Sequence, residues 1–89
     1  MKKLNKKDFV MGHDPVSMTP GEMLASLRKL QELTQSDLAR MTGMTQANIS
    51  NMESDRQQIG HDRALVLAKA LKVHPAVIMF PNYHVEEAA

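Results

Sequence analysis

Four short, uncharged side chains between residues 46 and 51 combine hydrogen-bonding groups with a methyl group, a chemistry suited to contacts with base edges. Gln46, Ala47, Ser50 and Asn51 are uncharged, and their spacing places them on the outward face of one helix. Amides and hydroxyls match the donors and acceptors at base edges, and a methyl group packs against thymine in the major groove. A helix face that only meets water usually carries charged residues. The uncharged side chains on this helix face therefore favour a surface that reads bases.

Capping residues predict the two short helices that would position this surface. Thr34 is expected to cap the first of them, and Asp37 three residues later completes a capping box. Gly43 is expected to end that helix, because glycine accepts the left-handed conformation of a tight turn. Thr45 then caps the second helix, whose apolar residues recur at the spacing of a buried face. The sequence thus predicts a helix, a turn and a second helix.

This stretch resembles the helix-turn-helix of Cro and the lambdoid phage repressors, often called the XRE family. The residues that carry the resemblance are Thr34-Gln35, Leu38-Ala39, Gly43, Gln46, Ile49-Ser50 and Glu53. The resemblance covers about residues 20–80. It implies an all-α fold, a compact five-helix, lambda-repressor-like bundle preceded by an irregular N-terminal arm. The family usually has glycine where this chain has Asp55, a residue type that tolerates the left-handed conformation better than most.

The resemblance also implies a structural pair between Arg28 and Glu53. In the resembled repressors, an arginine on the first helix pairs with the glutamate that ends the recognition helix. A bidentate contact between guanidinium and carboxylate would hold the base-reading helix in place. The alternative is a solvated Arg28. Even when formed, such a pair adds little net stability, because desolvation opposes the attraction.

Polar residues beside the base-reading face are candidates for contacts with the DNA backbone. We expect donation to phosphates from Gln35, Asn48, Ser54, Arg56, Gln57, Gln58 and His61. Gln35 would start a helix, where unpaired N–H groups also favour an anion. The alternative for the segment after residue 53 is an ordinary polar connector.

The overall composition indicates one small domain without metal or redox chemistry. The chain has 89 residues, no cysteine and a net charge of +1. It lacks the run of about 18 apolar residues that a membrane span needs, and it lacks a signal peptide. We therefore expect a cytoplasmic protein that does not bind membranes. Its four histidines have no metal-ligand spacing, and no nucleotide-binding glycine motif is present, so we expect no cofactor and no enzymatic activity.

The chain divides into three predicted segments. Residues 1–18 form a basic arm with apolar residues at 9–11, residues 19–81 form the DNA-binding domain, and residues 82–89 form an acidic tail. Helical spacing predicts core side chains on two further helices, the first starting at Thr19 and the other running from His61 to Lys72. These core residues are Met23, Leu24, Leu27, Leu30, Leu33, Ala64, Leu65, Leu67, Ala68 and Leu71.

The segment before the tail carries more apolar surface than one short helix can bury. Val77, Ile78 and Phe80 span less than one helical turn, so at least one of them must point away from the core. We predict that these three residues form a homodimer interface, with Ile78 as the position where a charge would split the dimer. The alternative is that all of them belong to the protomer's own core.

These features together predict a sequence-specific regulator of transcription, in particular a repressor, that binds double-stranded DNA as a homodimer. The two recognition helices would enter major grooves roughly 34 Å apart on a near-palindromic operator. The alternative is an antitoxin that binds both its operator and a protein toxin, as small members of the resembled family often do. Only the part-apolar basic arm favours that alternative. A third interpretation, an adaptor without a DNA role, is disfavoured by the polar face at residues 46–51.

Overall fold

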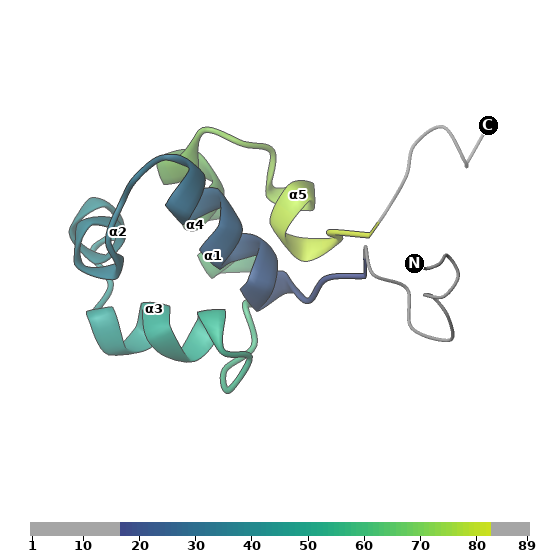
Figure 1. Cartoon of the computed structure of the whole chain (residues 1–89), viewed down its shortest axis with the longest axis horizontal. Helices are drawn as coiled ribbons and strands as arrows, with labels where there is room; N and C mark the ends of the chain where they lie inside the picture. The colour runs from purple at the N-terminus through teal and green to yellow at the C-terminus, as the bar shows by residue number, and fades with distance from the viewer. Residues whose placement is uncertain (1–16, 83–89) are drawn as a thin grey trace, which may run out of the picture.

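The computed structural model describes residues 17–82, which fold into five helices (Figure 1). In chain order these are α1 (Pro20–Leu30), α2 (Gln35–Thr42), α3 (Gln46–Glu53), α4 (His61–Leu71) and α5 (Pro75–Met79). The predicted all-α, five-helix fold is therefore confirmed. The predicted irregular arm, apart from its last two residues, and all but the first residue of the predicted acidic tail lie outside the described residues.

Local capping interactions explain where the first three helices begin. Thr19, Thr34 and Thr45 have extended backbones, and each side chain accepts a hydrogen bond from the backbone N–H three residues later. Thr19 forms a capping box with Glu22, and Thr34 forms one with Asp37. These contacts satisfy N–H groups that have no partner inside the helix. All three helix starts agree with the sequence prediction.

The turn between α2 and α3 depends on Gly43. This residue has a φ of 74°, in the left-handed region, and its N–H donates to the carbonyl of Ala39 at the end of α2. A Cβ atom at Gly43 would meet nothing within 4 Å. Glycine is therefore favoured here by the backbone conformation alone. The reversal of the chain at this point allows α3 to pack against both α2 and α1.

A single hydrophobic core holds the five helices together. Besides its contact with α3, α1 packs on α5, while α4 packs on α2 and α5. The largest fully buried side chains come from every helix: Leu24, Leu38, Ile49, Met52, Leu67, Leu71 and Ile78. Burying one such side chain contributes about 1.5–3 kcal/mol. Two of the seven belong to α3, so the position of this helix is fixed by the core itself.

Two predicted core residues are exposed. Leu30 is 80% exposed and Leu65 is 44% exposed. Leu30 is the last residue of α1, whose buried residues include Leu24 and Arg28 instead. The prediction for Leu30 and Leu65 was wrong because apolar spacing shows that a helix has a buried face but does not fix where that face ends.

The structure also corrects the predicted dimer interface. Ile78 has no exposed surface and belongs to the core cluster, whereas Val77 is 37% exposed and Phe80 is 61% exposed. Successive residues of a helix are separated by about 100°, so a single turn cannot direct all three toward the core. The three residues do not all face the core, as predicted. The prediction that Ile78 lies in a dimer interface was wrong, because its side chain is buried in the core. Val77 and Phe80 remain accessible on the surface.

Candidate nucleic-acid interface

Helix α3 has one buried face and one polar face. On the inner side Ile49 and Met52 have no exposed surface. On the other side Gln46 and Ala47 are exposed, and Ser50 and Asn51 are half-buried. Helix α3 lies along one edge of the molecule (Figure 1). Because its apolar residues are buried, the rotation of the helix about its axis is fixed, and the four predicted base-reading residues share its other face.

The predicted pair between Arg28 and Glu53 is present and bidentate. Nε of Arg28 donates to Oε2 of Glu53 at 2.7 Å, and Nη2 donates to Oε1 at 3.0 Å. Nη1 donates to the carbonyl of Leu33 at 2.8 Å, so the guanidinium is bonded on three nitrogens. The hydrogen bonds that Arg28 donates to Glu53 raise the pKa of Arg28 above its ordinary value, and the group stays charged. This pair attaches the C-terminal end of α3 to α1.

A chain of polar contacts leads from this ion pair to the front of α3. Nε2 of Gln35 donates to Oε1 of Glu53 at 3.0 Å, and Nε2 of Gln46 lies 3.4 Å from Oε1 of Gln35. An ionised carboxylate only accepts hydrogen bonds, so Gln35 must turn its amino group toward Glu53 and its oxygen toward Gln46. Ser36 approaches the oxygen of Gln46 at 3.4 Å. The amide of Gln46 is thus oriented by its neighbours.

The side chain of Gln35, predicted to contact phosphate, is therefore engaged by Glu53 in the free protein. Gln35 is also the first residue of α2, where the backbone N–H groups of the helix N-terminus favour an anion. Asn48, another predicted backbone contact, is half-buried, and its side-chain oxygen accepts from the hydroxyl of Thr45 at 2.9 Å. Both residues thus have partners within the helix-turn-helix.

The segment after α3 presents the remaining predicted backbone contacts. Ser54, Arg56 and Gln58 are exposed, Gln57 is half-buried, and His61 is exposed as the first residue of α4. Nε of Arg56 donates to Oγ of Ser54 at 3.1 Å. The N–H groups of residues 56 and 57 both donate to the carbonyl of residue 51, at 2.9 and 3.2 Å. The loop is therefore folded back onto the end of α3.

The side chain of Asp55 has a role that the sequence analysis missed. One carboxylate oxygen accepts from the hydroxyl of Thr19 at 2.6 Å, and the other accepts from the N–H of Gly21 at 3.1 Å. Asp55 has a φ of 64°. The absence of the family's glycine was visible in the sequence. Its partners, 36 and 34 residues away, were not.

The described residues offer no alternative site for metal chemistry or for crossing a membrane. No group of three or more His, Asp or Glu side chains within residues 17–82 is arranged to hold a metal ion. None of the helices in the same range has both the length and the apolar character that a lipid bilayer requires.

Comparison with known proteins agrees with this geometry. Residues 24–78 match the helix-turn-helix family HTH_3, of the XRE or Cro/C1 type. The chain belongs to this family. The chain is therefore a DNA-binding transcriptional regulator and not an enzyme. Among curated proteins, none has a sequence that matches this chain.

Solved structures of other regulators share the fold. The P22 c2 repressor, in complex with a synthetic operator, matches with a TM-score of 0.69 and 26% identity over 74% of this chain and 100% of that chain. The restriction-modification controller protein C.AhdI from Aeromonas hydrophila matches with a TM-score of 0.65 and 27% identity, over 67% and 91% of the two chains. The clp gene regulator ClgR from C. glutamicum, at 22% identity, has the same fold, with a TM-score of 0.63 over 66% and 77%.

Proposed function

We propose that this protein represses transcription as a homodimer that recognises a near-palindromic operator in the cytoplasm. The observation that carries the proposal is the placement of Gln46, Ala47, Ser50 and Asn51 on a helix whose opposite face is locked in the core. Uncharged amides, a hydroxyl and a methyl group can discriminate base pairs in the major groove. A helix that cannot rotate presents them in one fixed arrangement.

Contacts with the DNA backbone would set the register of this helix on the duplex. The candidates are Gln35, Asn48, Ser54, Arg56, Gln57, Gln58 and His61. They lie before, on and after α3. A helix-turn-helix placed in a groove would bring such residues to the phosphates on both sides of that groove. The similarity to the P22 c2 repressor, which was solved with an operator, supports this arrangement.

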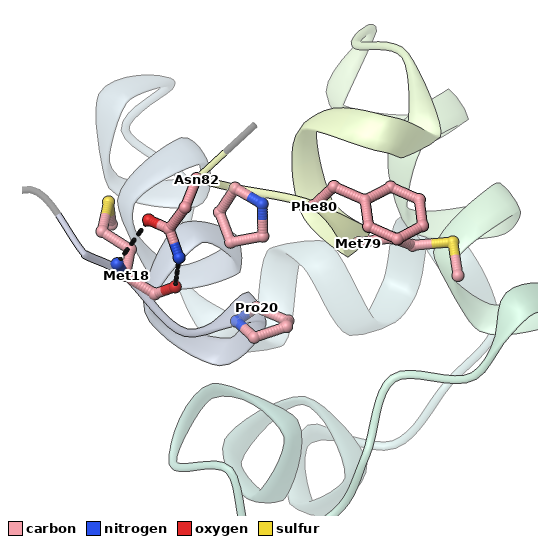
Figure 2. Close-up of a pocket in the computed structure, with 6 residues that line it drawn as sticks. Met18, Pro20, Met79, Phe80 and Asn82 are labelled. Carbon is pink, nitrogen blue, oxygen red and sulfur yellow. Dashed lines mark hydrogen bonds between the residues drawn. The ribbon is translucent and has the colours of Figure 1, made fainter. Parts of the chain in front are cut away.

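A second copy of the chain is the partner that we propose for Val77 of α5 and for Phe80, the residue that directly follows this helix. Both residues are exposed, and Phe80 lines a hollow of about 390 Å³ together with Met18, Pro20, Met79, Pro81 and Asn82 (Figure 2). An exposed aromatic ring beside an apolar hollow suits a two-fold interface, because each protomer then offers both the protruding and the receiving surface. The same symmetry is required by a palindromic operator.

The antitoxin alternative remains a prediction from the sequence alone. It depended on the apolar part of the basic arm, at residues 9–11, which lies outside the described residues. A cognate toxin would have to bind in addition to DNA, so the alternative keeps the base-reading face and adds a protein partner.

Selection of bound sequences from random DNA tests the proposal. The wild-type protein is expected to enrich a motif with two related half-sites, and the double variant Gln46→Ala/Asn51→Ala is expected to lose that enrichment while remaining folded. Lys69→Ala is the matched control, because it truncates an exposed side chain on α4, outside the helix-turn-helix. Absence of any enriched motif would reject sequence-specific binding, and a motif without a repeat would reject the dimer.

A further inference from the structure

The carboxylate of Asp55 joins the loop after α3 to the start of α1. The backbone of Asp55 is in the left-handed region, with a φ of 64°, so the chain turns sharply just after α3 ends at Glu53. That turn brings the side chain to the N-terminal end of α1. There it accepts two hydrogen bonds, one from the hydroxyl of Thr19 and one from the N–H of Gly21.

Both partners are suited to an acidic side chain. The N–H of Gly21 belongs to the first turn of α1, where backbone donors lack a helical acceptor and where a negative charge is favoured. The hydroxyl of Thr19 accepts from the N–H of Glu22 as the helix cap and still has its own proton to donate to Asp55. The contact therefore extends the cap of α1 with a group delivered by a distant loop.

Gly21 leaves the space that this contact requires. A Cβ atom at residue 21 would lie 2.6 Å from Oδ1 of Asp55 and 2.8 Å from the carbonyl oxygen of Glu53. Side chains of any other residue type would therefore push the loop away from α1. The glycine on α1 and the acidic residue in the loop are thus both suited to the close contact between these two segments.

Two carboxylates now attach the end of α3 to α1. Glu53 binds Arg28, near the C-terminal end of α1, and Asp55 binds Thr19 and Gly21 at its N-terminal end. The core and the Glu53 attachment hold α3 itself, and the Asp55 attachment additionally holds the loop that follows α3. Ser54 and Arg56, two of the predicted contacts with the DNA backbone, are the chain neighbours of Asp55.

We propose that Asp55 is a positioning residue for DNA recognition, which holds the end of α3 and the loop 54–58 in the geometry that meets the DNA backbone. This inference rests on the proposed function, because it assigns Asp55 a role at the same interface. Asp55 does not itself contact phosphate, since its charge has the wrong sign for that contact.

Charge alone predicts the opposite effect of removing Asp55. Deleting an acidic group beside a DNA-binding surface reduces repulsion from phosphate and should tighten binding. A loss of affinity on removal would therefore reveal the positioning role. Asp62→Asn is the matched control for charge, because Asp62 is a fully exposed acid in the first turn of α4 and its replacement changes the net charge by the same amount.

Two substitutions separate the carboxylate from the backbone conformation. Asp55→Gly keeps the positive φ without strain and removes both hydrogen bonds. Asp55→Asn keeps the shape and retains one side-chain oxygen as an acceptor for the N–H of Gly21. If positioning matters, Asp55→Asn should resemble the wild type more closely than Asp55→Gly does.

The test combines amide hydrogen exchange on the free protein with affinity for a selected duplex, both measured well below each variant's melting temperature. In Asp55→Gly we expect faster exchange of the N–H groups of Arg56 and Gln57, and an affinity lower by about tenfold, the equivalent of one lost charged hydrogen bond. Asp55→Asn should lose less DNA affinity than Asp55→Gly does. Asp62→Asn should bind the duplex as tightly as the wild type or more tightly.

The outcomes are distinguishable. A lower melting temperature for Asp55→Gly with unchanged exchange at residues 56 and 57 and unchanged affinity would overturn the proposal and leave a purely stabilising contact. Tighter binding by Asp55→Gly would overturn it as well, in favour of simple repulsion. If the wild type selects no DNA sequence, the proposed function fails, while the exchange measurement still decides whether Asp55 holds the loop.

Discussion

Gly21 of α1 lies directly against the carbonyl oxygen of Met52 in α3. A Cβ atom at residue 21 would be only 2.3 Å from that oxygen. Real Cβ atoms do not approach an oxygen so closely, so the two helices can adopt this distance only because residue 21 has no side chain. The packing of α3 on α1 therefore depends on a hydrogen atom at residue 21 in place of a side chain.

Gly21→Ala is expected to destabilise the fold by about 1–3 kcal/mol, because the added methyl group forces two backbones apart. The melting temperature should fall, and the DNA affinity of the remaining folded protein should fall with it. Gly60→Ser is the control, since a Cβ atom there meets nothing within 4 Å and serine can cap α4. Equal stability of the two variants would show that α1 and α3 can separate without cost.

Gln46→Ala and Asn51→Ala are each expected to cost about 1–3 kcal/mol of binding free energy at the cognate site and to relax the preference at one or two base pairs. The reason is the exposed position of Gln46 and the half-exposed position of Asn51 on the polar face of α3. Titrations on cognate and scrambled duplexes measure the effect. Gln58→Ala offers a contrast, because a backbone contact should weaken binding to both duplexes alike. If Gln46→Ala behaves in that way too, it does not read a base.

Arg56→Ala is expected to weaken binding on every sequence and to reduce the salt dependence of the binding constant by about one in its logarithmic slope. Arg56 is exposed in the loop after α3, where we propose that it contacts a phosphate. The measurement is a salt titration beside Lys69→Ala, which removes one positive charge from α4. A slope that changes equally in both variants would assign the effect to net charge rather than to a contact.

Phe80→Glu is expected to convert the proposed dimer to a monomer while the helical content persists. Phe80 is 61% exposed, so a carboxylate there is harmless on a free surface and costly inside an interface. Operator affinity should fall by orders of magnitude, because the second half-site is no longer held at a high effective concentration. Sedimentation and circular dichroism report the two properties separately.

Ile78→Glu provides the contrasting variant, since it buries a carboxylate in the core and should unfold the chain. The pair therefore distinguishes the proposed interface residue, which caps the end of α5, from a core residue within that helix. A Phe80→Glu protein that remains a dimer with full affinity would place the interface elsewhere.

Asp37→Asn is expected to lower stability at neutral pH and to have progressively less effect in acid. The backbone N–H of Thr34 donates to the carboxylate at 2.8 Å and Arg40 donates at 2.6 Å, and in that order they hold the pKa of Asp37 below its ordinary value of 3.8. A lowered folded-state pKa means that the stabilisation is complete above the unfolded pKa and disappears as the pH falls through the folded one. Thermal melts between pH 7 and pH 2 should show the gap between wild type and variant closing. A gap independent of pH would mean that the charge contributes nothing.

The sequence predicted those features that depend on neighbouring residues. The caps at Thr19, Thr34 and Thr45 involve residues three positions apart, and the left-handed turn at Gly43 is a property of one residue. Both can be recognised without knowing the tertiary fold. The pair between Arg28 and Glu53 is 25 residues apart and was predicted through a family resemblance, not from local chemistry.

The features that were missed depend on how the helices meet. The contact of Asp55 with Thr19 joins segments that approach only when α3 seats on Gly21. The inward rotation of Ile78 could not be read from a helix of five residues, because so short a segment has no periodicity from which to choose a face. Both depend on tertiary packing that no spacing rule encodes.

The contact between Met18 and Asn82 couples the two ends of the folded segment. The side-chain oxygen of Asn82 accepts from the N–H of Met18 at 2.8 Å, and its amino group donates to the carbonyl of the same residue at 2.9 Å (Figure 2). The entry to α1 and the exit from α5 should therefore fray together and not independently. Helix α1 also packs against α3. A force applied to the C-terminal end of the domain would therefore be transmitted to α3 through α1.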